Sequence, residues 1–208
     1  MKIVAFLSAM LFGAHAVKVG DKIPTDIDLH FGFPPENVNL SQRIAGKKVI
    51  IMGLPGAFTP TWSTRQVPVS KDCLMPFHWF HQFCPRTFFG THCSLLIGVV
   101  HFFHQGYLAK EDALKQLGVD EVIVYCVNDG AVMAAWSEDQ GVPTDSIIKL
   151  MGDPYAILTE KLDLELTHAG PKSVGLINRC KRHALYVVDG KVEIVRVAEK
   201  EDDPAGMF

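Results

Sequence analysis

Two uninterrupted apolar runs constrain the fold of this chain more than any other feature of its sequence. Lys47–Leu54 and Glu121–Val127 are rich in β-branched residues and show little alternation of polar and apolar positions. Strands that are buried on both faces of a sheet have this composition. We therefore expect a central β-sheet whose two faces are both covered by other parts of the chain.

The remaining sequence supplies helical patterns and turn signals around these two strands. Gly118 suits a helix C-cap, Asp153 suits a helix N-cap, and Asp189-Gly190 is a strong signal for a hairpin turn. The further predicted elements are helices over residues 108–117, 131–139 and 154–162, a strand over 147–151, and hairpin strands over 184–188 and 192–197. This order indicates an α/β fold in which helices flank a central mixed β-sheet.

The length and the charge of the chain limit its function. A chain of 208 residues suits one globular domain, and a formal net charge of −3 argues against a nucleic-acid-binding or polybasic membrane role. The sequence contains no nucleotide loop, phosphate motif or metal-binding cluster. We therefore expect no cofactor, no bound metal, no nucleic-acid partner and no membrane partner.

The first sixteen residues have the form of a targeting segment. Lys2 precedes an apolar run over residues 3–12, and Ala14 and Ala16 then form an A-x-A cleavage pattern. We predict that residues 1–16 direct the chain to the secretory pathway or to an organelle. The alternative is a buried first strand or helix, in which case the chain stays in the cytoplasm.

Residues 69–105 differ in composition from the rest of the chain. They hold three of the five cysteines and seven of the thirteen phenylalanines, and no helical or strand period persists through them. His78, His81 and Cys84 are spaced three residues apart, which would place them on one face of a helix. No second ligand pair follows at a metal-binding spacing, so we do not expect a metal site here.

A retained intron explains this segment better. Val69-Ser70 can be encoded by a consensus intron start, and Phe102–Gln105 by a pyrimidine-rich intron end in the same reading phase. We interpret residues 69–105 as a translated retained intron or a gene-prediction error. On this interpretation, a single domain over residues 17–208 is interrupted by the insert, and we expect the insert to project from the domain with few core contacts.

Several motifs outside the insert resemble those of one family. Pro55–Thr61 (PGAFTPT) follows a buried strand and resembles the active-site loop of type II, Prx5-like peroxiredoxins, whose pattern is P-x-x-x-T-x-x-C. The resemblance continues at Val17–Pro24, at Val127–Asp129, and at Arg179 with Arg182. It implies a thioredoxin-like fold and the reduction of hydrogen peroxide and alkyl hydroperoxides by thiols. It also implies glutaredoxin or thioredoxin as the reductant, and it is compatible with a homodimer.

The resemblance assigns roles at the catalytic loop and fails at one position. Pro55 would shield the reactive sulfur, Thr59 would hold the peroxide, and Arg179 would stabilise the thiolate. Trp62 stands where the pattern requires the peroxidatic cysteine. An indole ring cannot form a sulfenic acid, so we predict no peroxidase turnover by the chain as written. The alternative function is that of a non-catalytic thioredoxin-fold binding protein, a pseudoenzyme.

Two cysteines remain outside the insert. Cys180 lies between Arg179 and Lys181, and these cations would lower the pKa of its thiol if it were exposed. Cys126 lies in a predicted buried strand on the same side as Val124, and the simplest interpretation is a small buried apolar residue. We therefore name Cys180, and after it Cys126, as the candidates for residual redox reactivity.

Overall fold

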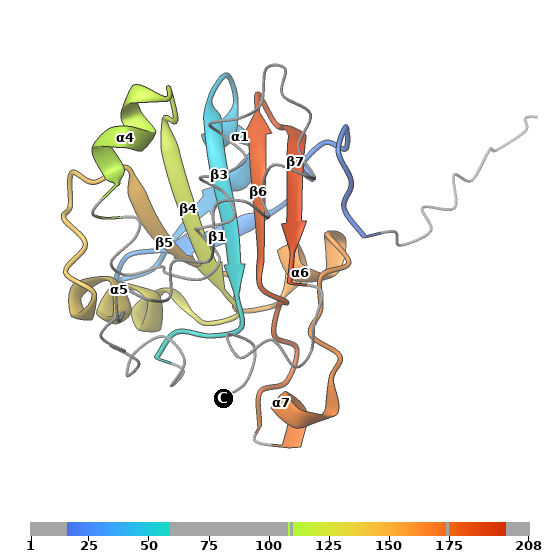
Figure 1. The fold of residues 1–208 in the computed structure, drawn as a ribbon. Helices are drawn as coiled ribbons and strands as arrows, with labels where there is room; N and C mark the ends of the chain where they lie inside the picture. The colour runs from blue at the N-terminus through green and yellow to red at the C-terminus, as the bar shows by residue number, and fades with distance from the viewer. Residues whose placement is uncertain (1–15, 59–107, 109, 174, 199–208) are drawn as a thin grey trace, which may run out of the picture.

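The computed structural model describes residues 16–58, 108, 110–173 and 175–198. These residues form a seven-stranded sheet in the order β2-β1-β5-β4-β3-β6-β7 (Figure 1). The strands are β1 (Asp28–Phe31), β2 (Glu36–Asn39), β3 (Lys48–Leu54), β4 (Glu121–Cys126), β5 (Ile148–Gly152), β6 (His183–Val188) and β7 (Lys191–Val197). The helices are α1 (Leu40–Ile44), α4 (Glu111–Gln116), α5 (Gly130–Asp139), α6 (Ile157–Lys161) and α7 (Ala169–Ser173).

The sheet is mixed, as the sequence predicts. Strand β4 runs parallel to both β3 and β5, whereas β6 pairs antiparallel with β3 and with β7. On the other side of the sheet, β1 pairs antiparallel with β2 and with β5. Because β3 and β4 are parallel, their carboxyl ends lie at the same edge, where Leu54 is the register partner of Cys126.

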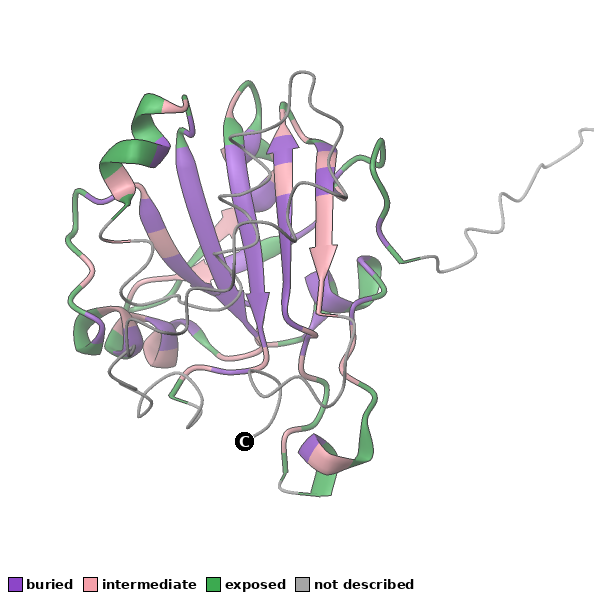
Figure 2. Cartoon of the chain, in the orientation of Figure 1, coloured by how far each residue is buried: buried purple, intermediate pink, exposed green. Residues whose placement is uncertain are grey.

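Both faces of the central strands are buried, which explains their unbroken apolar sequence (Figure 2). Along β4, Ile123 and Tyr125 pack in the core that also contains the buried residues of α1 and α6. The alternate residues Val122, Val124 and Cys126 pack in the core formed with α4 and α5. The two covering layers of helices therefore match the predicted α/β architecture.

Turns and helix caps occur at the residues whose type favours them. Gly118 has φ +77° and its N–H donates to Lys115 O, closing α4. Asp189 and Gly190 have φ values of 48° and 74°, the left-handed conformations that a type I′ hairpin turn requires. Asp129 caps α5, since its carboxylate accepts a hydrogen bond from the N–H of Val132.

Helix α6 begins later than the sequence predicts. The expected span was 154–162, but the helix covers Ile157–Lys161. Ala156 takes a left-handed conformation with φ 56° and delays the first helical turn. Asp153 still supports the start of the helix, because its carboxylate accepts hydrogen bonds from the N–H groups of Ile157 and Thr159.

Several elements of the structure were not predicted from the sequence. Strands β1 and β2 and helices α1 and α7 have no counterpart among the elements predicted from the sequence. Within the described ranges, none of the helices has the length and apolar character needed to cross a membrane. The interpretation of residues 1–16 as a targeting segment falls outside the described residues except at Ala16, and that of residues 69–105 as a projecting insert lies wholly outside them.

Candidate active site

The first component of the site is the loop that follows β3. Pro55 is half-buried and Gly56 is buried, whereas Phe58 is exposed and has φ 54°. The chain therefore leaves the sheet at the carboxyl end of β3 and turns outward. Pro55 is the first residue after β3, and its role of shielding a reactive sulfur stays a prediction.

The second component follows the neighbouring strand. Val127 and Asn128 come directly after β4, which is parallel to β3, so they lie beside the loop. The side-chain oxygen of Asn128, Oδ1, accepts a hydrogen bond of 3.1 Å from the backbone N–H of Ala57. This bond connects the carboxyl ends of the two central strands through one side chain.

The third component is Arg179, which comes from the segment before β6. Its Nη1 donates to Val127 O at 2.5 Å and to Asn128 Oδ1 at 3.1 Å. Its Nε is buried and has no hydrogen-bond partner among the described residues. Both protons of Nη1 are thus held by the Val127–Asn128 segment, which fixes the guanidinium next to the loop that carries Pro55.

Of the predicted site residues, the structure describes Pro55 and Arg179, whose catalytic roles stay predictions. Pro55 and Arg179 are far apart in sequence and meet at this edge through Ala57 and Asn128. Thr59 and Trp62 lie outside the described residues, so their places in the site stay predictions. The sequence motif at Val127–Asp129 included Asn128, but its bridging role could not be predicted, because no local pattern indicates which distant groups a side chain will contact.

Cys180 does not have the exposure on which its predicted reactivity depended. Its side chain is fully buried and its Sγ donates a hydrogen bond of 3.0 Å to Leu54 O. Burial raises the pKa of the thiol far above its usual value, and the opposing effect of Arg179 is smaller. The exposure on which activation by the neighbouring cations depended is therefore not met by Cys180 in this fold.

Cys126 is also buried, at the end of β4. It packs in the same apolar core as Val124, on the side that the strand alternation predicts. Burial raises the pKa of its thiol well above the usual value. No group of three or more His, Cys, Asp or Glu residues suitable for a metal ion occurs in the described part of the chain.

Comparison with known proteins extends these observations. The Redoxin family model matches residues 18–206 of this chain. The chain is 33% identical to Peroxiredoxin-2B of Arabidopsis thaliana over 87% of each sequence. It is 30% identical to the chloroplastic Peroxiredoxin-2E of the same organism, and the match covers 88% of this chain but only 63% of that relative.

A solved structure has a similar fold. Reduced Prx3 from Vibrio vulnificus, determined in complex with H2O2, superimposes with a TM-score of 0.61 and 25% identity, covering 91% of this chain and 92% of that one. The neighbour confirms a thioredoxin-like α/β fold. Together with the family match and the identity to Peroxiredoxin-2B, it shows that this chain belongs to the type II peroxiredoxins, a family of thiol-dependent peroxidases.

Proposed function

We propose that this scaffold serves the reduction of hydrogen peroxide and alkyl hydroperoxides by thiols, and that Trp62 leaves the chain as written without turnover. One observation carries the proposal. The loop that begins at Pro55 and the guanidinium of Arg179 are joined through Asn128 at the carboxyl ends of the two central strands. The loop leads on toward residues 59 and 62, the positions at which the family pattern requires threonine and cysteine.

The chemistry of such a site depends on one sulfur atom. A thiolate attacks the nearer oxygen of the peroxide, an S–O bond forms and the O–O bond breaks, and the leaving oxygen takes a proton to become water or an alcohol. The enzyme sulfur ends as a sulfenic acid, which thiols from the reductant convert back to the thiol. A fixed guanidinium supplies positive charge near the thiolate and the polarised O–O bond. The indole of Trp62 supplies no sulfur for any of these steps.

A steady-state assay tests this proposal. Peroxide consumption is measured with glutaredoxin or thioredoxin as reductant, for the chain as written and for its Trp62→Cys variant. We expect turnover only in the variant. Thr144→Cys is the matched control, because it adds a thiol at an exposed position before β5, away from the carboxyl ends of β3 and β4.

The alternative is a non-catalytic binding protein, and the assay separates it from the enzyme. If the Trp62→Cys variant stays inert, and stays inert after residues 69–105 are also removed, the peroxidase proposal fails and a pseudoenzyme role is favoured. Peroxide consumption by the unmodified chain would contradict the predicted effect of Trp62.

We also propose that residues 69–105 are dispensable for the domain. Helix α4, where the described chain resumes, has its own anchor: Glu111 accepts hydrogen bonds from the Ser146 hydroxyl at 2.8 Å and from the Ile147 N–H at 3.1 Å. Removing residues 69–105 is expected to leave the melting temperature equal or higher. A deletion variant that fails to fold would contradict the proposal, and sequencing the transcript would show whether Pro68 is followed directly by Gly106.

For the destination of the chain, we propose the secretory pathway or an organelle. The targeting pattern of residues 1–16 supports this, and two of the relatives are named as chloroplastic. Val17 is buried and its N–H donates to Leu162 O, so cleavage after Ala16 leaves an anchored first residue. N-terminal sequencing of the mature protein tests the cleavage site.

A homodimer is a separate expectation, and sedimentation of the purified domain tests it.

A further inference from the structure

The side chain of Asn128 hydrogen-bonds to both halves of the candidate site, the loop after β3 and Arg179. Its Oδ1 accepts from the Ala57 N–H and from Arg179 Nη1, each at 3.1 Å. These donors lie far from Asn128 in sequence, one in the loop after β3 and the other in the segment before β6. A single oxygen atom therefore links the loop after β3 to the guanidinium.

The backbone around Asn128 is itself held firmly. A Cβ on Gly152 would overlap the carbonyl oxygen of Asn128, so only glycine permits this close approach between β5 and the segment after β4. On one side, Cys126 O accepts a hydrogen bond of 2.8 Å from the Asp153 N–H. On the other side, Asp129 caps α5. Asn128 thus projects its amide from a rigid position, which is what a bridging group needs.

The contacts of Arg179 show what the bridge achieves. Both Nη1 protons are used, one by Val127 O and one by Asn128 Oδ1. The Nε–H is buried and has no partner among the described residues. The acceptors on Nη1 therefore fix the plane of the guanidinium while its Nε–H is left without a described acceptor. The neutral amide of Asn128 accepts the hydrogen bond from Nη1 without adding a negative charge next to the guanidinium. A carboxylate at the same place would add that charge.

We propose that Asn128 is a positioning residue, which acts through Arg179 by holding its guanidinium in a fixed relation to the active-site loop. The functional consequence rests on the proposed peroxidase function, whereas the positioning itself does not. Asn128→Ala removes the shared acceptor. Asn128→Asp keeps an acceptor oxygen but adds a charge that offsets the guanidinium.

The first test uses the full chain as written and does not depend on activity. NMR measures rotation of the Arg179 guanidinium through exchange between its Nη protons, with the signals assigned by loss in Arg179→Lys. We expect Asn128→Ala to speed this exchange several-fold, and Asn128→Asp to keep it slow. Asn37→Ala, on the exposed side of β2, is the matched control and is expected to change nothing. Unchanged exchange in Asn128→Ala would overturn the proposal.

The second test adds the same changes to the Trp62→Cys chain and measures the rate constant with hydrogen peroxide across pH. Asn128→Ala is expected to lower that constant roughly tenfold, the order of one hydrogen bond to a charged group. Asn128→Asp is expected to raise the apparent pKa of the introduced thiol, because the new carboxylate opposes the thiolate. If Trp62→Cys itself is inert, the peroxidase proposal fails and the NMR result still decides the role of Asn128. An active Trp62→Cys chain whose rate is unaffected by Asn128→Ala would refute a positioning role in catalysis.

Discussion

The imidazole Nε2 of His183 lies 3.2 Å from the hydroxyl of Tyr125, and both side chains are buried. The other ring nitrogen, Nδ1, lies 2.8 Å from Lys181 O, which can only accept. Nδ1 must therefore carry the proton, and Nε2 accepts from the Tyr125 hydroxyl. Burial disfavours the charged ring and lowers the pKa of His183 to about 4, so the ring is neutral at pH 7.

Stability should accordingly fall in acid. Between pH 6.5, the ordinary pKa of histidine, and pH 4, the unfolded chain binds a proton at residue 183 that the folded chain does not bind. The free energy of unfolding is therefore not reduced by His183 above pH 6.5 and falls progressively as the pH drops to 4. The total loss from this residue over that range is about 3 kcal/mol. Burial raises the pKa of Asp153, which gives the opposite slope, so the comparison must be with a histidine variant.

Denaturant titrations of the chain and of His183→Asn, between pH 7 and pH 4, test this expectation. Asparagine is chosen because its side-chain NH2 can replace the donor at Nδ1. The unmodified chain is expected to lose more stability than the variant over this range. Parallel curves for the two proteins would contradict a neutral, buried His183.

The same ring explains why residue 53 is glycine. Gly53 and His183 are register partners on β3 and β6, and a Cβ at residue 53 would lie 2.6 Å from His183 Nδ1. Gly53→Ala is expected to cost about 1–3 kcal/mol in the free energy of unfolding, since the ring cannot shift within a packed core. The effect should largely disappear in a His183→Ala background, and equal costs in both backgrounds would show that the ring is not responsible.

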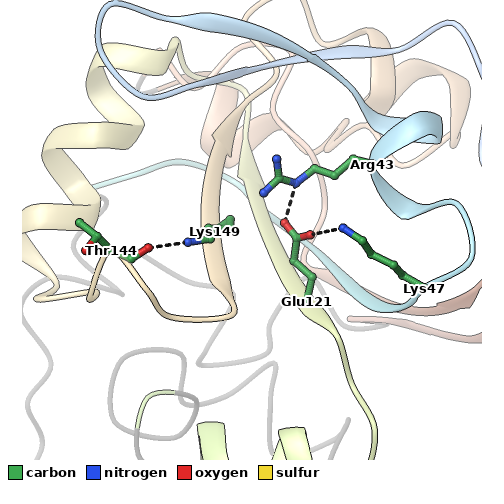
Figure 3. A network of polar contacts seen from close by, with 5 residues as sticks. All are labelled: Arg43, Lys47, Glu121, Thr144 and Lys149. Carbon is green, nitrogen blue, oxygen red and sulfur yellow. Dashed lines mark hydrogen bonds and ion pairs between the residues drawn. The ribbon is translucent and has the colours of Figure 1, made fainter.

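Glu121 is expected to contribute more to stability than an exposed carboxylate. It is buried at the start of β4, with Oε1 2.6 Å from Arg43 Nε and Oε2 3.4 Å from Lys47 Nζ (Figure 3). Glu121→Gln keeps the volume and loses the charge, and we expect a loss of about 1–2 kcal/mol. Glu193→Gln, which removes a more exposed partner of Lys191, serves as the control and should change stability by less than about 0.5 kcal/mol.

Cys126 and Cys180 are expected to resist alkylation in the folded protein. Both thiols are fully buried, and burial raises the pKa of each. Mass spectrometry of peptides after iodoacetamide treatment at neutral pH should find both residues unmodified until denaturant is added. Rapid native labelling of Cys180 would restore it as a candidate for redox reactivity.

The central sheet was the most predictable part of the fold. Lys48–Leu54 and Glu121–Cys126 are strands that are buried on both faces, and such strands leave an apolar run that can be recognised without knowledge of their neighbours. Strands β1 and β2 were missed for two reasons. Most of their residues are exposed or half-buried, and Pro34 and Pro35 stand in the turn between them. Their place in the sheet depends on long-range pairing with β5, which local patterns do not encode.

The site was predictable only as far as family motifs reached. Pro55 and Arg179 were identified by their match to such motifs, and the structure places them at one edge of the sheet. The bridge through Asn128 and the burial of Cys180 were not predicted. Both depend on which segments meet in space, and the charges next to Cys180 in sequence gave the opposite expectation.

The most direct test of the account is a single-turnover reaction with hydrogen peroxide, followed by mass spectrometry of the peptide that contains residue 62. In the Trp62→Cys chain, we predict rapid addition of one oxygen to that peptide and its reversal by glutaredoxin or thioredoxin. In the chain as written, we predict no reversible oxidation there and no thiol-dependent loss of peroxide. Reductant-dependent peroxide consumption by the unmodified chain, with oxidation at Cys126 or Cys180, would contradict the account.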